Sequence, residues 1–338
     1  MRYLLFICVL LAALLSFYLA FRWRGAGWIP RVALVAAGLA VLTYGSWRMM
    51  PQAAPAFDTG EDVRPLYAQK RVLPKGPIPV YHLGHSLVGC DMPAMLAQLA
   101  GHDYALQLGW GTALREHFEG RQAINGFDKE NATPKYRDAH EALKSGEYAA
   151  FVMTEMVNLR DAILYKDSAT FARKWAEEAV AGRPDIEIFL YETWHSLDGE
   201  EDWLKRLPGD LDGLWSQVLW PAARGAGRPV WVIPAGQVMA RLVTEAEANG
   251  GIAELKSRED LFAMTEDGKR DQIHPNDLGI YLVALTHYAV IYGKSPVGLP
   301  HELLKADGSP AVAPSAELAR RMQEIVWEVV TSQPLTGL

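Results

Sequence analysis

The chain is poor in cysteine and has no excess of positive charge. Its 338 residues include two cysteines, Cys8 and Cys90, and Cys8 lies within an apolar run, so we expect no disulfide between them. Two cysteines also provide no framework for a metal site. The formal net charge is -7, and no basic stripe is present that would neutralise a phosphate backbone. The sequence therefore predicts no metal, no cofactor and no nucleic-acid partner.

Acidic residues are missing from the first fifty positions, which contain two apolar runs instead. Residues 3–21 read YLLFICVLLAALLSFYLAF, which is long enough to cross a hydrocarbon core as a helix. The second run, at about residues 32–48, is shorter and less hydrophobic. Tryptophans near the ends of the runs are typical of a membrane interface. We predict a membrane-anchoring helical hairpin over residues 1–50, which contacts the lipid bilayer through residues 3–48.

Three arginines between the runs determine the expected orientation. Arg22, Arg24 and Arg31 place the connecting turn in the cytoplasm, so everything after Arg48 lies outside it. The expected location is the inner or plasma membrane, crossed twice, with the remaining domain extracytoplasmic. In one alternative the first run is a signal peptide, although its apolar region is long and no A-x-A-like cleavage site follows it. In the other, the second run lies on the membrane surface and the domain faces the cytoplasm.

A proline-rich segment at residues 51–77 is predicted to link the membrane hairpin to a folded domain at residues 78–338. In that domain short apolar runs alternate with helical patterns. The expected strands are residues 78–84, 104–109, 148–156, 186–194 and 229–234, and the expected helices are residues 92–101, 136–145, 170–181, 211–224, 237–249, 278–292 and 316–331. Continuously apolar strands separated by helices indicate a parallel sheet covered on both faces. We therefore expect a flavodoxin-like three-layer α/β/α domain with a mostly parallel five-stranded sheet.

Four short segments fall at or beyond the carboxyl ends of these strands, where open parallel sheets bind their ligands. They are GHSL at residues 84–87, GWGT at 109–112, EMVN at 155–158 and DQIHPND at 271–277. In this order and spacing they resemble the four blocks of the SGNH (GDSL-like) hydrolase superfamily, over roughly residues 78–293. The most specific part is an Asp three residues before a His, followed by an N-D-x-G helix start.

The resemblance implies a role for one residue of each block. Ser86 corresponds to the nucleophile, His274 to the catalytic base and Asp271 to the carboxylate that orients it. The oxyanion hole would be formed by the backbone N–H groups of Ser86 and Gly111 and by the side-chain amide of Asn158, with Gly109 as the alternative glycine. The chain departs from the family where His85 replaces an Asp and where Val157 and Leu159 replace the residues that usually flank Asn158.

These residue types suit nucleophilic catalysis. A serine hydroxyl reacts once a base takes its proton, and a neutral imidazole oriented by a carboxylate is such a base. Ser86 by itself would be interpreted as a turn or capping residue, and the downstream D-x-x-H pattern favours a nucleophile. Substrate-binding candidates are the residues that end the other strands: Trp110, Glu155, Trp194 and His195.

We therefore expect a serine esterase that hydrolyses O-acyl esters, such as O-acetyl groups on carbohydrate, through an acyl-enzyme. Its substrate partner would be a small acyl ester or an acylated glycan. One alternative is an O-acyltransferase that modifies an envelope polysaccharide, because a sugar hydroxyl can replace water. Another is a catalytically inactive glycan-binding protein that keeps the fold, which the changes around Asn158 suggest.

Overall fold

The computed structural model describes residues 57–68, 71–199 and 201–338, and the isolated positions 18, 22, 32, 33, 35 and 36. The chain divides into two compact units, Met1–Phe57 and Asp58–Leu338. Apart from those isolated positions, the predicted membrane hairpin lies outside the described residues. Among the residues that are described, no helix is long and apolar enough to cross a membrane. The hairpin remains a prediction from the sequence.

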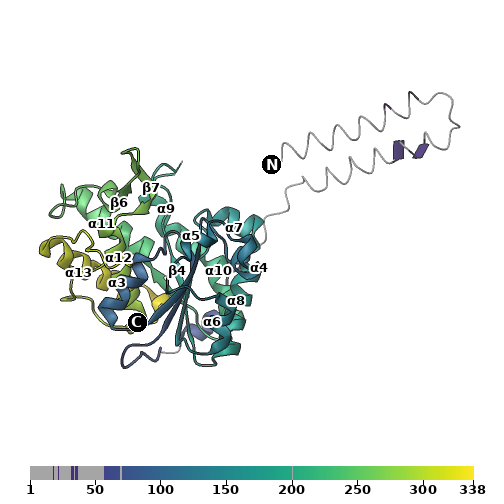
Figure 1. The fold of residues 1–338 in the computed structure, drawn as a ribbon, viewed down its shortest axis with the longest axis horizontal. Coiled ribbons are helices and arrows are strands. Elements are labelled where there is room, and N and C mark those ends of the chain that lie inside the picture. The colour runs from purple at the N-terminus through teal and green to yellow at the C-terminus, as the bar shows by residue number, and fades with distance from the viewer. Residues whose placement is uncertain are drawn as a thin grey trace. The chain divides into compact units, whose positions relative to one another are not determined.

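A parallel five-stranded sheet forms the centre of the second unit (Figure 1). Its strands are β1 (Val80–His85), β2 (Tyr104–Gly109), β3 (Ala150–Met153), β4 (Glu187–Glu192) and β5 (Trp231–Pro234). They lie in the order β2-β1-β3-β4-β5, and all neighbouring pairs are parallel. This is the strand order of flavodoxin-like doubly wound sheets. The five predicted strands are confirmed, with ends that differ by up to three residues.

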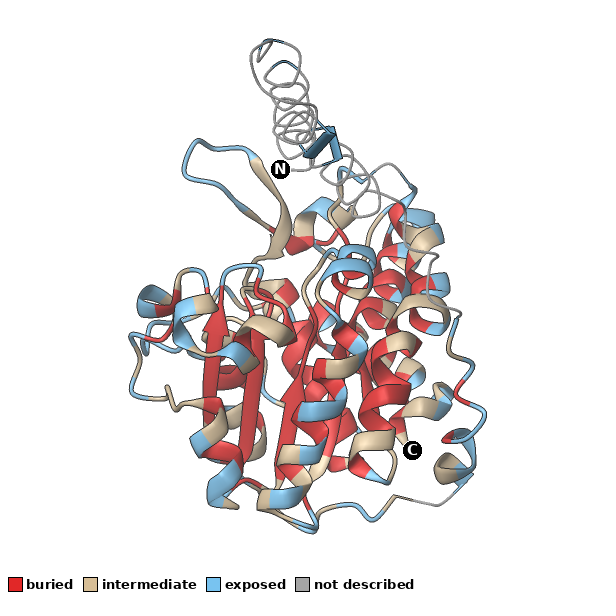
Figure 2. Ribbon diagram, turned by 90° about the vertical axis from the view of Figure 1, so that its right-hand side faces the viewer, coloured by how far each residue is buried: buried red, intermediate tan, exposed pale blue. Residues whose placement is uncertain are grey.

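The strands divide the unit into two hydrophobic cores, because successive residues of a strand point to opposite faces. In β3, Ala150 and Val152 enter one core, and Phe151 and Met153 enter the other. One face is covered by α3 (Asp91–Ala100), α11 (Ala235–Ala248), α12 (Asp277–Tyr292) and α13 (Ala316–Ser332), and the other by α6 (Ala139–Ser145), α8 (Ser168–Gly182) and α10 (Ser216–Ala226) (Figure 1). Figure 2 shows that the strands are buried along their length.

Several short elements were not predicted. They are α4 (Leu114–Glu119), α5 (Phe127–Glu130), α7 (Leu159–Tyr165), α9 (Trp203–Asp210), the 3-10 turns η1 (Arg64–Ala68), η2 (Arg121–Ala123), η4 (Arg258–Leu261) and η5 (Pro334–Thr336), and an antiparallel hairpin of β6 (Phe262–Met264) and β7 (Arg270–Pro275). The predicted helix at residues 211–224 is also divided, because the π-helical turn η3 (Leu211–Trp215) joins α9 to α10. This turn follows Pro208, which lacks the N–H that a regular helix uses.

The proline-rich segment that we predicted to be a linker packs against the domain from Asp58 onward. Asp58 pairs with Arg224 of α10 at 2.5 Å. The Tyr67 ring makes edge-to-face contacts with Trp220 and Trp231, with centroid distances of 5.7 and 5.5 Å. Its hydroxyl also donates to the Val230 carbonyl at 2.8 Å. The folded unit therefore begins about twenty residues before the predicted boundary at residue 78.

Arg71 forms hydrogen bonds that connect the segment before β1 to both β4 and α12. Its side chain is 1% exposed, and Nε and Nη2 donate to the two carboxylate oxygens of Glu187, each at 2.7 Å. The guanidinium also donates to the carbonyls of Val290 and Ile291 in the last turn of α12. These carbonyls have no partner within the helix, so a buried cation is well placed there.

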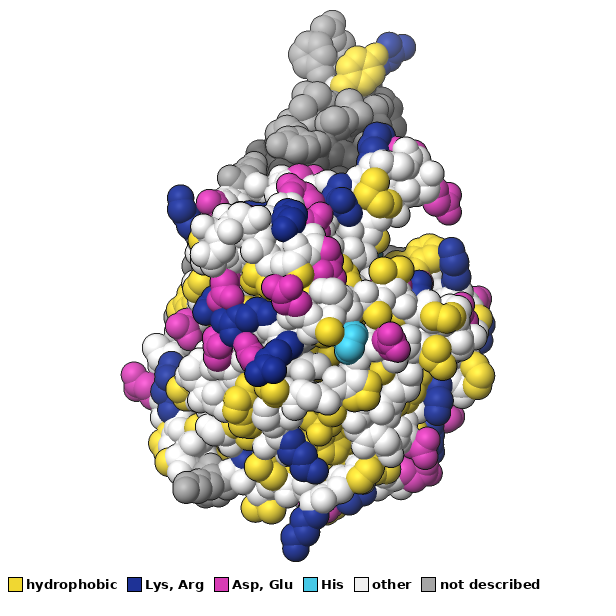
Figure 3. All heavy atoms as spheres, turned by 90° about the vertical axis from the view of Figure 1, so that its left-hand side faces the viewer, with side chains coloured by type: hydrophobic (Ala, Val, Ile, Leu, Met, Phe, Trp, Pro, Cys, Tyr) yellow, Lys and Arg dark blue, Asp and Glu magenta, His cyan; other side chains and the backbone are white. Residues whose placement is uncertain are grey.

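The face formed by α11 and α13 carries charges of both signs. Arg321 of α13 pairs with Glu245 of α11 at 2.6 Å and with Glu328 at 2.9 Å. Figure 3 shows Lys or Arg side chains beside Asp or Glu side chains over this part of the surface, with small apolar areas between them. Opposite charges interspersed in this way produce no extended field of one sign on this face.

Burial keeps five histidines neutral. It lowers the pKa of His85, His102 and His287 to about 4 and that of His117 to about 3, and it moves the pKa of His82 well below its usual value. Each ring lies in or beside the cores, where the charged form would lose its hydration.

Two buried carboxyl groups shift in the opposite direction. Burial raises the pKa of Glu155 to about 7 and that of Glu192 to about 8. Glu192 is hydrogen-bonded by the backbone N–H and the side-chain amide of Gln237, at 3.2 and 3.0 Å. These groups therefore bind protons in the folded state at a pH where the unfolded chain has released them.

We expect the free energy of unfolding to decrease as the pH is lowered from 6.5 to about 4.5. Over this interval the five histidines gain protons in the unfolded chain but stay neutral in the folded one, so the unfolded state is favoured. The two carboxyl groups oppose this, which leaves a net difference of about three protons. Denaturant unfolding at a series of pH values measures how steeply the free energy of unfolding changes with pH, and this steepness gives the difference in bound protons between the two states. His287→Gln should reduce that difference by about one proton. A free energy of unfolding that stays constant or increases toward pH 4.5 would contradict the explanation.

Candidate active site

Ser86, His274 and Asp271 meet at the carboxyl end of the sheet. His274 Nε2 lies 2.9 Å from Ser86 Oγ, and His274 Nδ1 lies 2.9 Å from Asp271 Oδ2. Because an ionised carboxylate only accepts, Nδ1 carries the proton and donates to Asp271. Nε2 is then the acceptor for the Ser86 hydroxyl. Two residues 188 positions apart in the sequence are thus joined in one hydrogen-bonded chain.

The turn that carries Ser86 is supported by His85, the last residue of β1. His85 Nδ1 accepts from the Leu87 N–H at 3.3 Å, and Nε2 donates to the Glu155 carbonyl at 2.9 Å. Both ring nitrogens are therefore satisfied in one neutral tautomer, in agreement with the lowered pKa of this histidine. A carboxylate at this position could accept from the turn, but it could not also donate to the segment that follows β3. His85 therefore links the turn after β1 to that segment.

Contacts from three neighbouring segments hold the backbone on both sides of Ser86. The Gly84 carbonyl accepts from His117 Nε2 at 2.9 Å, and the Leu87 carbonyl accepts from the Tyr191 hydroxyl at 3.2 Å. A Cβ atom at Gly84 would lie 2.5 Å from the Thr154 methyl group, so this position requires glycine. The serine is presented on a backbone with little freedom to move.

Asp271 is fixed by its own turn. Its Oδ1 accepts from the backbone N–H groups of Ile273 and His274, both at 2.8 Å. Burial acts to raise the pKa of Asp271, but these two N–H groups and the His274 ring outweigh it, so its pKa lies below the usual value. Asp271 is therefore ionised near neutral pH, as an orienting carboxylate must be. The His274 side chain is 44% exposed, so the site opens to solvent.

Strand β7, which carries both residues, is held by the segment that follows β4. Trp194 Nε1 donates to the Ile273 carbonyl at 2.9 Å, and the Leu197 N–H donates to the Gln272 carbonyl at 2.8 Å. Trp194 is 1% exposed. We predicted that Trp194 binds substrate, and this is wrong for the described conformation. Its buried indole positions the strand of the base instead.

The N-D-x-G sequence after His274 attaches β7 to α12. Asn276 Oδ1 accepts from the N–H groups of Leu278 and Gly279 as the helix cap, and its amide donates to the Asp260 carbonyl at 2.7 Å. A Cβ atom at Gly279 would lie 2.7 Å from the Leu261 carbonyl oxygen, so the close approach of these segments requires glycine. The motif therefore determines where the hairpin meets the helix.

Two further substrate-binding predictions are wrong, because the residues are interior. Glu155 is fully buried, and its Oε1 accepts from the N–H groups of Leu114 at 3.2 Å and Met156 at 2.8 Å. His195 is also buried, with Nε2 2.9 Å from Asp210 Oδ2. Both residues lie beyond the ends of their strands, β3 at Met153 and β4 at Glu192, and both are buried. Trp110, by contrast, is 47% exposed.

The predicted oxyanion donors have different environments. Asn158 is the N-cap of α7, and its amide donates to Asp161 Oδ2 at 3.0 Å, so this side chain is already engaged at a helix start. Gly111 lies two residues beyond β2, exposed, with a φ of +53° that favours glycine. Gly109, the alternative, is the buried last residue of β2. The N–H groups of Ser86 and Gly111 remain the predicted donors.

Within residues 57–68, 71–199 and 201–338 and the six isolated positions, no group of three His, Cys, Asp or Glu side chains is arranged to hold a metal ion. Cys90 is partly buried, and burial raises the pKa of its thiol to about 11. It therefore stays protonated at neutral pH and lacks the thiolate that a reactive cysteine needs.

Comparisons with known proteins find similarity only at the level of structure. No family model and no curated protein matches the chain. A DUF4886 family protein from Bacteroides uniformis is 12% identical with a TM-score of 0.47, covering 75% of this chain and 95% of its own. A protein described as a GDSL-like lipase from Parabacteroides merdae is 12% identical with a TM-score of 0.40, covering 67% and 99%. Phospholipase A1 from Streptomyces albidoflavus is 13% identical with a TM-score of 0.33, covering 63% and 100%.

We expect Gly279→Ala to destabilise the protein by roughly 1–3 kcal/mol, because the added methyl group would collide with the Leu261 carbonyl and Pro275. The collision would also move β7, so the alignment of His274 should suffer. Gly209→Ala in α9 is the matched control, since its Cβ would meet nothing within 4 Å. It should be neutral or stabilising by up to about 1 kcal/mol. Denaturant unfolding of both variants measures the difference, and equal stability would refute the packing argument.

Proposed function

We propose that the chain is a serine ester hydrolase of the SGNH type. The observation that supports this is the continuous hydrogen-bonded chain from Ser86 Oγ through the His274 ring to Asp271, with 2.9 Å at both links. A nucleophile, a base and an orienting carboxylate in this order are the arrangement of a serine catalytic triad.

The reaction would proceed by acyl transfer through the enzyme. Ser86 Oγ attacks the ester carbonyl carbon while its proton passes to His274 Nε2, and Asp271 stabilises the imidazolium. His274 then gives the proton to the leaving alcohol oxygen, and the acyl group stays on Ser86. Water attacks this acyl-enzyme, His274 accepts its proton, and the acid leaves as the proton returns to Ser86.

The oxyanion would be stabilised by the N–H groups of Ser86 and Gly111. They lie beyond the ends of β1 and β2, whose last residues, His85 and Gly109, pair in the parallel ladder. Asn158 would join them only if its amide left Asp161 when substrate binds. Each donor aimed at the developing charge is typically worth about 10²–10³ in turnover.

We propose O-acyl groups on carbohydrate, such as O-acetyl esters, as the substrate. The exposure of His274 supports a bulky alcohol part, because the leaving alcohol must reach Nε2 from the solvent side. The same openness favours a second candidate, O-acyl transfer to a polysaccharide, since a sugar hydroxyl can approach the acyl-enzyme as water does. A catalytically inactive glycan-binding protein is the remaining alternative.

We further propose that residues 3–48 anchor the domain to the membrane, with the active site on the extracytoplasmic side. The support is in the sequence, which has two apolar runs joined by a turn with three arginines. An enzyme attached there would meet acylated polysaccharide of the cell envelope.

Purified protein should be labelled by a fluorophosphonate probe and should release acid from a panel of acyl esters, and Ser86→Ala should abolish both. Asp271→Asn should keep the fold but lower kcat by about 10²–10⁴-fold, because an amide facing His274 Nδ1 favours the wrong tautomer. Labelling and acid release measure these effects, with circular dichroism as the check of folding.

Wild-type protein that reacts with neither probe nor ester, or Ser86→Ala that keeps its activity, would refute the hydrolase proposal. Supplying an acyl donor together with a glycan acceptor separates hydrolysis from transfer. Acyl groups found on the acceptor would identify the chain as a transferase, and acyl groups found only as free acid would identify it as a hydrolase.

The proposed orientation predicts that a membrane-impermeant fluorophosphonate labels wild-type protein after the outermost permeability barriers are opened but with the inner or plasma membrane intact. Ser86→Ala is the control for specific labelling, and a permeant probe reports the total protein. Labelling that requires lysis of that membrane would place the domain on the cytoplasmic side and would overturn the orientation.

A further inference from the structure

We infer that Trp110 and the pocket beside it form the subsite that binds a pyranose ring of the substrate. The inference rests on the proposed ester hydrolysis for the reaction, but the binding that it describes can be tested without catalysis. It assigns the recognition of the glycan to the η2–α5 region.

Trp110 follows the strand next to the one that leads to the nucleophile. Trp110 follows Gly109 at the end of β2, and Ser86 follows His85 at the end of β1, and Gly109 and His85 pair in register. Adjacent strands lie about 4.8 Å apart, so the two backbones run side by side where they leave the sheet. A sugar bound at Trp110 would be the acylated residue or its neighbour.

The Trp110 ring is fixed although it is half-exposed. Its Nε1 donates to Glu130 Oε1 at 2.6 Å. One part of the ring lies against Gly126, where an added Cβ atom would be 2.3 Å from Trp110 Cδ2. Gly126 has a φ of +68°, so both its conformation and the close approach require glycine. An aromatic surface that is rigid and open to solvent can bind a ligand without first being ordered.

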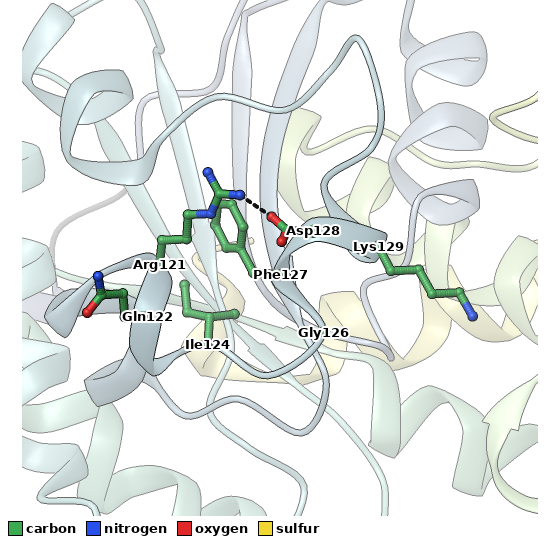
Figure 4. A pocket seen from close by; sticks show the side chains of 7 residues that line it. All are labelled: Arg121, Gln122, Ile124, Gly126, Phe127, Asp128 and Lys129. Carbon is green, nitrogen blue, oxygen red and sulfur yellow. Dashed lines mark hydrogen bonds and ion pairs between the residues drawn. The ribbon is translucent and has the colours of Figure 1, made fainter.

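The pocket beyond Trp110 has a volume of about 660 Å³, within the usual range of about 300–1,000 Å³ for ligand sites (Figure 4). Buried Ile124 and Phe127 provide its apolar part. Polar side chains form the rest, namely Arg121, Gln122, Asp128 and Lys129. Figure 4 shows Arg121 paired with Asp128, which balances the one charge against the other.

This combination fits a sugar better than a lipid chain or a phosphate. A long acyl chain needs a continuous apolar groove, whereas much of this lining is polar. A phosphate is best held by several unpaired cations, and of the two cations that line this pocket, Arg121 and Lys129, the first is paired with Asp128. A pyranose presents an apolar C–H face to an aromatic ring and hydroxyl groups to amide, carboxylate and ammonium groups. Lys129 Nζ, 5.6 Å from the Trp110 ring centroid, is within reach of such hydroxyls.

The test measures binding of partially O-acetylated oligosaccharides, built on xylose, glucose or N-acetylglucosamine, to full-length Ser86→Ala protein, which cannot consume them. Adding Trp110→Ala should weaken the binding of whichever of these oligosaccharides binds most tightly by about tenfold. Gly126→Ala should weaken it as well, because the methyl group displaces the ring without removing it. Glu130→Ala should also weaken binding, and Glu130→Gln should restore it by keeping an acceptor for the indole N–H. Leu164→Ala, which removes an equally exposed apolar side chain from α7, is the control and should change nothing.

Kinetics on the Ser86-containing protein provide the second readout. Trp110→Ala should raise KM for the acetylated oligosaccharide by about tenfold and should lower kcat/KM less for a small chromogenic acetate than for the oligosaccharide. An equal loss of kcat/KM on both substrates would show that Trp110 supports the active-site structure instead of binding the sugar. Glycan binding that is unchanged in Trp110→Ala, Gly126→Ala and Glu130→Ala would overturn the subsite. Oligosaccharide binding that depends on Trp110, in a protein that hydrolyses no ester, would refute the hydrolase and leave the subsite standing.

Discussion

The His274 imidazole, held between the hydroxyl of Ser86 and the carboxylate of Asp271, is the contact on which the rest of this site depends. The 2.9 Å link from His274 to Ser86 requires the end of β1 and β7 to keep a fixed separation, although these strands belong to a parallel sheet and a separate antiparallel hairpin. Much of the surrounding structure serves this purpose. Trp194 holds β7 from the side of β4, and Asn276 and Gly279 join it to α12.

The support beneath the nucleophile consists of buried neutral polar groups. His85 and His117 each donate to a backbone carbonyl and accept from an N–H group, so neither leaves a ring nitrogen unsatisfied. Such a network tolerates burial because every group has a partner and no charge is present. The same burial that fixes the serine turn makes the folded state sensitive to acid, because these rings can be protonated only at the expense of the fold.

Trp110 and Trp194 show how the same residue type, in similar positions at strand ends, takes different roles. Trp194 follows β4, an inner strand whose end is covered by the segments that carry the hairpin, and its indole N–H donates to a backbone carbonyl. Trp110 follows β2, an edge strand, and its ring remains half-exposed beside a pocket. Neighbouring segments therefore decide which aromatic residue is available to a substrate.

Hydrophobic periodicity was sufficient to identify the five strands and the long helices, because each is buried along a regular face. The Asp271–His274 spacing and the Gly84–Ser86 segment indicated which residues would meet, since parallel strands bring their carboxyl ends to one edge. The β6–β7 hairpin, the burial of Glu155 and His195 and the capping role of Asn158 could not be read from the sequence. At a strand end the chain fixes where a residue lies along the backbone, but the direction and exposure of its side chain depend on segments distant in the sequence that pack against it, and only the tertiary structure brings those segments together.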